Sequence, residues 1–241
     1  MATFQKVKEQ NFIELCADGS YQEIKNALDS GANVNTFINS ANEFGSTPLM
    51  MAGRWNTPDV VKLLIDYGAD VNFTAYDGNT ALMWAASDNK PEAIASIINA
   101  GANVNAARYD GLTPIMGAAN RNTIEAVKVL LNAGADVKAR NSIGMTALLY
   151  AAMNNPDPKV AEILIEAGSD DVPNKNGRTA LILAAMMNNA DVLDELMKAG
   201  AEVHARDTDM KTALDYAREN DKLKGTSALL RLEELSRESI I

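Results

Sequence analysis

The chain contains very little of what catalysis, metal binding or disulfide cross-linking requires. Its 241 residues include one histidine, His204, and one cysteine, Cys16. A lone cysteine cannot form a disulfide within the chain, which favours a reducing compartment. A His/Cys metal site or a Ser/His/Asp triad would depend on His204 without a second histidine or a nucleophile motif beside it. We therefore expect a cytoplasmic protein with no catalytic residue, no metal and no cofactor.

Long hydrophobic runs and an excess of positive charge are also absent. No stretch approaches 18 apolar residues, and the N-terminal segment MATFQKVKEQ lacks the apolar core of a signal peptide. Lys and Arg number 22 against 32 Asp and Glu, which gives a net charge of −10 at pH 7. Binding to nucleic-acid phosphates needs the opposite balance. We expect neither nucleic acid nor a membrane as partner, and we interpret the acidity mainly as a solubilising charge, with a basic partner left open.

The most regular feature of the sequence is a threonine that recurs every 33 residues. The series is Thr47, Thr80, Thr113, Thr146, Thr179 and Thr212. In five of the six cases a glycine lies two residues earlier, and Pro or Ala and then Leu or Ile follow. A second series keeps nearly the same step: Gly31, Gly68, Gly101, Gly134, Gly168 and Gly200. Such spacing indicates a repeat array whose core is shared between neighbouring units.

Residues 78–110 are the clearest copy of the unit. Asp77-Gly78 is a turn signal, because glycine accepts the positive φ that a tight turn needs. Thr80 can cap a helix formed by the Ala-rich run that follows it. A second helix is predicted to begin at Pro91 and to end at Gly101. Each unit is therefore predicted to be a turn followed by two helices.

The full pattern resembles the ankyrin repeat over nearly the whole chain. It reads Gly-x-Thr-(Pro/Ala)-(Leu/Ile)-x-x-Ala-Ala, then a helix, then Gly-Ala-(Asp/Asn)-Val-Asn. The resemblance implies an all-α repeat solenoid of stacked β-turn and helix-turn-helix units, curved, with a capping repeat at each end. It also implies protein binding on a concave face, and it does not identify the partner.

We expect seven units within one domain that spans residues 1–241. The N-terminal capping repeat covers 1–41, the internal repeats cover 42–74, 75–107, 108–140, 141–173 and 174–206, and the C-terminal capping repeat covers 207–241. Three irregularities are predicted: a longer loop near 36–42, an irregular closing turn after Gly168, and a reshaped last turn. The last follows because Met210 replaces the turn glycine, and positive φ is costly for methionine.

The resemblance also implies which positions face a partner: those beside the turn glycine and those at the end of the first helix. Here these positions carry many aromatic, Met and Arg side chains, types that are enriched at interface centres. The candidate partner-binding residues are Phe44, Arg54, Trp55, Tyr76, Asp77, Asp88, Tyr109, Asp110, Leu112, Arg121, Ile143, Met145, Met153, Arg178, Met186 and Met187. The plainer alternative is that these side chains only pack between neighbouring turns. Trp84 and Tyr150 lie one step inward, and the sequence leaves open whether they belong to the core or to the groove.

Three functional hypotheses follow from the sequence. The first is a non-catalytic, monomeric interaction module that binds another protein through its groove and turn tips. The second is a structural or regulatory partner of an enzyme or toxin encoded by a neighbouring gene. The third is a host-directed effector exported without a cleaved signal. The many Thr-Ala-Leu signatures and the frequent asparagines resemble those of a natural bacterial protein.

Overall fold

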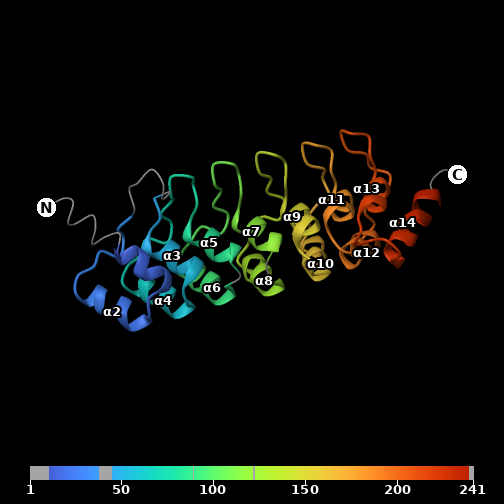
Figure 1. Cartoon of the computed structure of the whole chain (residues 1–241). Helices are drawn as coiled ribbons and strands as arrows, with labels where there is room; N and C mark the ends of the chain where they lie inside the picture. The colour runs from blue at the N-terminus through green and yellow to red at the C-terminus, as the bar shows by residue number, and fades with distance from the viewer. Residues whose placement is uncertain (1–10, 38–44, 89, 122, 239–241) are drawn as a thin grey trace. The chain divides into compact units, whose positions relative to one another are not determined.

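A computed structural model describes residues 11–37, 45–88, 90–121 and 123–238 of the chain (Figure 1). Residues 11–18 are helical, and the helices that follow are α2 (Tyr21–Asp29), α3 (Pro48–Trp55), α4 (Pro58–Asp66), α5 (Ala81–Ser87), α6 (Pro91–Asn99), α7 (Pro114–Arg121), α8 (Ile124–Asn132), α9 (Ala147–Asn154), α10 (Pro158–Glu166), α11 (Ala180–Met187), α12 (Ala190–Lys198), α13 (Ala213–Glu219) and α14 (Ser227–Glu238). None of the residues in these ranges forms a strand. No helix among them has the length and apolar character needed to cross a bilayer. The predicted all-α repeat architecture is confirmed.

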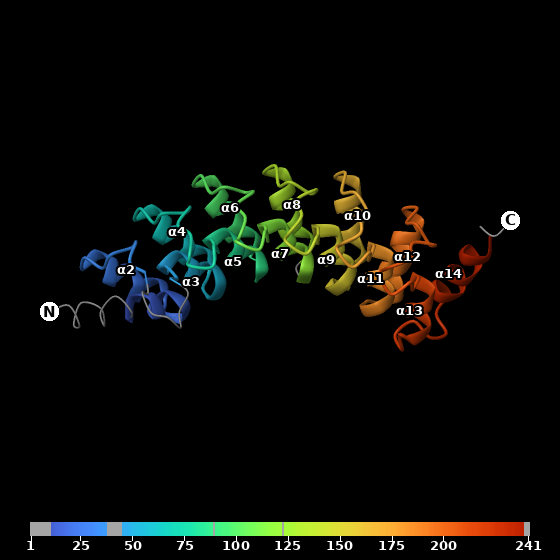
Figure 2. The same cartoon turned by 90° about the horizontal axis from the view of Figure 1, so that it is seen from above.

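Contacts between residues divide the chain into two compact parts, which are larger than single repeats and are called unit 1 and unit 2 from here on. Unit 1 comprises Met1–Pro114 and Asn132–Ala135, and unit 2 comprises Ile115–Leu131 and Asp136–Ile241. In unit 1, α3 contacts α5, and α4 contacts both α2 and α6 (Figures 1 and 2). In unit 2, α11 contacts α9 and α13, and α12 contacts α10 and α14. Within each unit, the first helices of the repeats therefore form one layer and the second helices form another.

The core of each unit lies between these two layers. Helix α4 buries four apolar residues between Val60 and Leu64, as the helical spacing predicts. Small residues allow the first helices to approach closely: a Cβ atom on Gly53 of α3 would lie 3.3 Å from the carbonyl oxygen of Ala81 in α5. Each repeat buries its apolar face only against its neighbours, so stability is shared along the array.

The recurring threonines cap the first helices. The hydroxyl of Thr80 accepts a hydrogen bond from the backbone N–H of Met83. The same bond is made by Thr47, Thr146, Thr179 and Thr212. Thr113 differs, because its buried Oγ1 has no hydrogen-bond partner in the described part of the chain. A side-chain cap contributes about 1 kcal/mol, so each capped turn is stabilised locally as well as by packing.

Asparagine side chains connect successive repeats, a feature that the sequence analysis missed. In unit 1, Nδ2 of Asn35, Asn72 and Asn105 donates to the carbonyl oxygens of Gly68, Gly101 and Gly134 at 3.0, 3.0 and 3.1 Å. In unit 2, Nδ2 of Asn155, Asn188 and Asn220 donates to the carbonyl oxygens of Ala119, Ala152 and Ala185 at 3.1, 2.9 and 3.0 Å. The second set satisfies carbonyl groups that the ends of the first helices leave free.

The closing turn after Gly168 is irregular, as predicted. Residues 170–174 contain no turn where the other repeats have one. Instead, the carboxylate of Asp171 accepts a hydrogen bond of 2.8 Å from the backbone N–H of the buried Ala180, at the start of α11. The residue Asp171 as a whole is exposed, but its carboxylate is partly buried, and this burial raises the pKa of Asp171. The hydrogen bond from Ala180 lowers the same pKa by a smaller amount. The longer loop predicted near 36–42 falls largely on residues outside the described ranges.

Replacing Asp171 with asparagine is expected to alter the pH dependence of stability. Because the pKa of Asp171 is raised in the folded state, the folded chain binds this proton more tightly than the unfolded chain. Its contribution to the free energy of unfolding therefore falls as pH rises from the ordinary aspartate pKa of about 4 through the folded value. Asparagine keeps an acceptor for Ala180 and has no charge to bury. Urea unfolding at a series of pH values should show Asp171→Asn gaining stability over the wild type as pH rises, and a constant difference would contradict this.

The last turn keeps the geometry of the others, so the prediction of a reshaped turn is wrong. Met210 adopts a φ of 60°, the only positive φ among the described non-glycine residues. Its backbone N–H donates to the carbonyl of Asp207 at 3.0 Å, as Gly177 donates to Asn174 at 2.9 Å. The side chain of Asp207 also accepts the backbone N–H of Lys211 at 3.1 Å. These bonds hold the turn in the left-handed conformation despite the Cβ atom of methionine.

Replacing Met210 with glycine is expected to raise the free energy of unfolding by about 0.5–1 kcal/mol. The left-handed conformation costs an L-residue about 1–2 kcal/mol, and glycine removes this cost. Part of the gain is lost again, because glycine gives up more backbone entropy on folding than methionine does. Little burial is lost, because Met210 is 66% exposed. Urea unfolding followed by circular dichroism measures the change, and a destabilised variant would show that the methionine side chain makes a contact of its own.

Candidate functional site

The turn tips are hairpin-like loops with the same backbone hydrogen bonds in both units. At the tip that precedes α5, the backbone N–H of Ala75 donates to Asn79 at 2.8 Å, and that of Gly78 donates to Ala75 at 2.9 Å. Successive tips are also joined to one another. The backbone N–H of Tyr109 donates to Asp77 in unit 1 at 3.4 Å, and that of Lys175 donates to Ile143 in unit 2 at 3.1 Å. Side chains on the tips are therefore presented from an ordered backbone.

Unit 1 carries an aromatic surface, which we define as Arg54, Trp55, Tyr76, Trp84, Asp88 and Tyr109. Trp55, Tyr76 and Tyr109 are 56%, 53% and 80% exposed. The guanidinium carbon of Arg54 lies 4.4 Å from the ring centroid of Trp55 and 4.7 Å from that of Trp84. Its Nε lies 3.2 Å from a carboxylate oxygen of Asp88. Four side chains from two neighbouring repeats therefore form one cluster. Arg54 and Trp55 come from α3, Trp84 comes from α5, and Asp88 directly follows α5.

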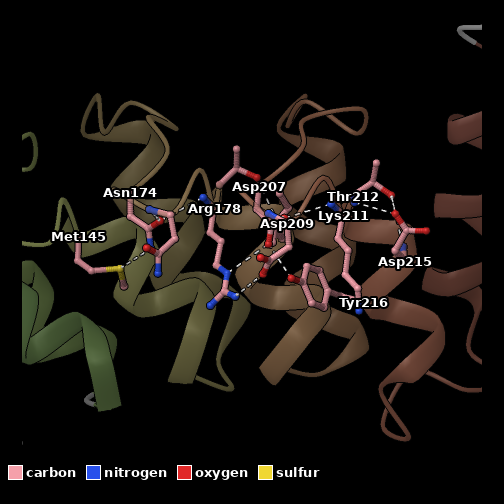
Figure 3. A network of polar contacts seen from close by, with 12 residues as sticks. Met145, Asn174, Arg178, Asp207, Asp209, Lys211, Thr212, Asp215 and Tyr216 are labelled. Carbon is pink, nitrogen blue, oxygen red and sulfur yellow. Dashed lines mark hydrogen bonds and ion pairs between the residues drawn. The ribbon is translucent and has the colours of Figure 1, made fainter.

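Unit 2 carries a polar network around Asp207, shown in Figure 3. The buried carboxylate of Asp207 accepts the hydroxyl of Tyr216 at 2.6 Å and the backbone N–H groups of Asp209 and Lys211 at 2.9 and 3.1 Å. Nε of Arg178 lies 3.4 Å from the same carboxylate, and Nη2 lies 3.8 Å from Asp209. The network joins the tips that precede α11 and α13 to the body of α13.

The electrostatics of this network favour a charged Asp207. Burial alone would raise the pKa of Asp207, but the hydrogen bonds from Tyr216, from the two backbone amides and from Arg178 outweigh it and lower the pKa. The hydroxyl of Tyr216 donates to this carboxylate, which raises the pKa of Tyr216. These bonds stabilise the charged form of Asp207, and they hold the side chain of Arg178 against the tip that precedes α13.

The comparison with protein families decides what these repeats are. A model described as ankyrin repeats, in three copies, matches residues 12–108, 97–172 and 148–237. The chain belongs to the ankyrin-repeat family. Ankyrin repeats are generally protein–protein interaction modules, and the fold is typically a non-catalytic scaffold. A search of curated proteins found no match to this ankyrin-repeat chain.

The other predicted residues of unit 1 lie on the ankyrin tips. The carboxylate of Asp77 accepts the backbone N–H of Asn79 at 3.0 Å. Asp110 is paired with Arg108 and accepts the backbone N–H of Leu112 at 3.1 Å, and the Arg108 bond lowers the pKa of Asp110. Both aspartates thus shape their tips. Leu112 is half-buried. Phe44 lies outside the described residues.

Two predicted tip residues of unit 2 have opposite environments. Ile143 is 58% exposed, whereas Met145 is only 3% exposed. The sulfur of Met145 lies 3.4 Å from Nδ2 of Asn174 on the next tip (Figure 3). The expectation that Met145 lies on the surface is therefore wrong, because its side chain fills the space between two successive tips.

The remaining predicted residues of unit 2 lie at the ends of first helices. Arg121 and Met187 are exposed, Met187 to 52%, and Met153 and Met186 are half-buried. Met187 occupies the same repeat position as Trp55 in unit 1, four repeats of 33 residues earlier. The structure thus offers a matched pair of exposed positions, one in each unit.

Trp84 and Tyr150 are both half-buried, and each contacts a neighbouring polar side chain. Trp84 stacks on Arg54, and the hydroxyl of Tyr150 accepts a hydrogen bond of 3.0 Å from Nδ2 of Asn141. Tyr150 follows the tip residue Asn141 by nine positions, and Tyr216 follows Asp207 by the same interval. The sequence analysis missed this pairing, although its spacing is visible in the sequence.

The sulfur-bearing side chain of Cys16 and the Nε2 atom of His204 are both buried. Cys16 is fully buried, and burial raises the pKa of its thiol to about 12, so it is an inert core residue. His204 Nε2 is buried without a hydrogen-bond partner in the described residues. Among those residues, no group of three or more His, Cys, Asp or Glu side chains is arranged to hold a metal ion.

Proposed function

We propose that this ankyrin-repeat protein is a non-catalytic, cytoplasmic and monomeric interaction module. It binds another protein through its turn tips and through the exposed face of its first helices. The observation that best supports this function is the aromatic surface of unit 1. Three large aromatic side chains are exposed there at the positions where ankyrin repeats face a partner. Aromatic side chains are enriched at the centres of protein interfaces, so their exposure at these positions favours an interaction.

The arrangement of the aromatic surface favours recognition over simple packing. Rings that only packed between turns would be largely buried, as Met145 is at 3% exposure. Trp55 is instead held in place by Arg54 while more than half of its surface remains accessible. A side chain whose rotamer is already fixed loses little entropy when a partner binds. Trp55 is therefore the strongest candidate for an anchor residue.

A pull-down from native lysate tests the proposal with the double variant Trp55→Ala/Tyr109→Ala. We expect at least a tenfold loss of captured partner, because truncation of aromatic anchors commonly costs about 2 kcal/mol or more and 1.4 kcal/mol is tenfold in affinity. The matched control is Tyr21→Ala, which removes an exposed aromatic side chain from α2 in the layer of second helices. Circular dichroism checks that both proteins keep their helices.

Unchanged capture by the double variant would contradict the proposed role of the aromatic surface. Loss of capture with Tyr21→Ala alone would place the partner on the second helices. Ile143 and Met187, the exposed apolar residues among the predicted positions of unit 2, are separate candidates. An Ile143→Ala/Met187→Ala variant in the same assay tests whether unit 2 also takes part in binding.

A further inference from the structure

The residue before the tip glycine is an aspartate on two tips of unit 1, and its carboxylate is bonded on both. Asp77 accepts the backbone N–H of Asn79 at 3.0 Å, and Asp110 accepts that of Leu112 at 3.1 Å. Each aspartate thus bonds the backbone two residues ahead, as Asx residues in turns commonly do. Asn176 occupies the same repeat position in unit 2. The structure gives it a different environment from that of the two aspartates.

The side chain of Asn176 makes no bond to the backbone two residues ahead. The N–H of Arg178 donates instead to Oδ1 of Asn174 at 3.1 Å. The same oxygen accepts the backbone N–H of Asn176 at 2.9 Å. Asn174 therefore holds both amides of this tip. The exposed carboxamide of Asn176 is left without a partner among the described residues.

An asparagine that precedes glycine can react with its own backbone. The backbone nitrogen of the next residue attacks Cγ of the asparagine, ammonia leaves, and a succinimide ring forms. Water then adds to either carbonyl of the ring and opens it, which gives aspartate or isoaspartate. Glycine favours ring closure because it has no Cβ atom to obstruct the attack. The chain contains one Asn-Gly pair, and it is Asn176-Gly177.

The turn sets the rate at which this reaction proceeds in the folded chain. The backbone N–H of Gly177 donates to the carbonyl of Asn174 at 2.9 Å, so the nitrogen must leave this bond before it attacks. No side-chain bond of Asn176 has to break as well. Opening of a single exposed turn is a local event that costs less free energy than global unfolding. Ring closure is therefore expected in the folded chain, more slowly than in the unfolded chain.

We propose that Asn176 is a site of spontaneous modification, at which the folded chain loses ammonia, takes up water and converts to aspartate and isoaspartate. Both products add a negative charge to the tip. The isoaspartate also routes the backbone through Cγ and turns the carbonyl of Asn176 into a free carboxylate. In the unmodified chain that carbonyl accepts the backbone N–H of Thr208 on the next tip at 3.0 Å. The isoaspartate product therefore alters the link between two successive tips.

The test is incubation of the full chain in mildly alkaline buffer, followed by proteolysis and mass spectrometry of the peptides. We expect both products to accumulate at Asn176, and faster at higher pH because the attacking amide must lose its proton. The internal control is Asn141, which is 8% exposed and accepts the N–H groups of Ile143 and Met145 at 3.1 and 2.8 Å. Conversion at Asn176 should exceed that at Asn141 at least about tenfold, which is about 1.4 kcal/mol in the barrier.

Two further samples separate the chemistry of the sequence from the effect of the fold. In guanidinium chloride both asparagines react without protection, so the ratio of the unfolded to the folded rate gives the protection of each site. We expect weaker protection at Asn176 than at Asn141. The variant Asn176→Gln should not yield the modified peptide, because glutamine would have to close a larger ring.

Three results overturn the proposal. The first is an intact Asn176 in the folded chain under conditions that convert it in guanidinium chloride. The second is protection of Asn176 equal to or stronger than that of Asn141. The third is a modified peptide that persists in Asn176→Gln, which would assign the reaction to Asn174 instead.

Discussion

Replacing Asn188 with alanine is expected to lower the free energy of unfolding by about 2–4 kcal/mol, because leaving a buried polar group unsatisfied costs about 1–3 kcal/mol. Asn188 is 4% exposed. Its Nδ2 donates to the carbonyl oxygens of Ala152 and Asn155 at 2.9 and 2.8 Å, and its Oδ1 accepts the backbone N–H of Asn189 at 2.9 Å. Alanine would leave these carbonyl groups and the N–H of Asn189 without their side-chain partner.

The matched control for Asn188 is Asn176→Ala. Asn176 is exposed on a turn tip, and none of the described residues bonds its side chain. Exposed substitutions of this kind usually change stability by no more than about 0.5 kcal/mol. Urea unfolding followed by circular dichroism measures both variants. Equal midpoints for Asn188→Ala and the wild type would show that the asparagine bonds between repeats do not stabilise the array.

The second large effect is expected at Gly78. Its φ is 86°, and a Cβ atom there would lie 2.9 Å from the backbone nitrogen of Tyr109 on the next tip. Alanine therefore adds backbone strain, which costs about 1–2 kcal/mol, to a collision with main-chain atoms that forces two tips apart at a further cost of about 1–3 kcal/mol. We expect Gly78→Ala to lower the free energy of unfolding by about 2–4 kcal/mol after the entropy gain of alanine is included.

Gly101→Ala separates the two contributions. Gly101 has a similar φ of 92°, but nothing lies within 4 Å of the position that its Cβ atom would take. The substitution adds the backbone strain without the collision, so we expect a loss of about 1 kcal/mol. If the two alanine variants unfold at the same urea concentration, close approach of the tips contributes nothing to stability.

Features that depend on local chemistry could be predicted from the sequence. The 33-residue spacing predicted the repeat, and the recurring threonines precede the first helices as their N-caps. Thr80, for example, caps α5. The glycines of both series adopt positive φ, for example Gly78 at 86° and Gly101 at 92°. The irregular turn after Gly168 was also predictable, because its sequence departs from the pattern. In each case one residue and its near neighbours suffice to determine the backbone.

Features that depend on contact between repeats could not be predicted in the same way. Met145 and Ile143 lie on either side of Gly144 on the same tip and both are apolar, yet one is buried and the other exposed. Arg178 was expected to face a partner, and it is held instead by Asp207, 29 residues later. Such outcomes depend on which atoms of the next repeat lie within a few ångströms, and repeat spacing alone carries no information on that.

The sequence by itself determined the family, the helix pattern and the set of candidate positions, because a repeat that recurs at a fixed interval must stack in the same way each time. Only the tertiary structure decided which candidates are available to a partner. It brought Arg54 between Trp55 and Trp84, buried Met145, and held Met210 in a left-handed turn through the bonds to Asp207. The physical reason is that exposure and pairing are properties of neighbouring repeats in contact, whereas turns and caps are properties of the chain within one repeat.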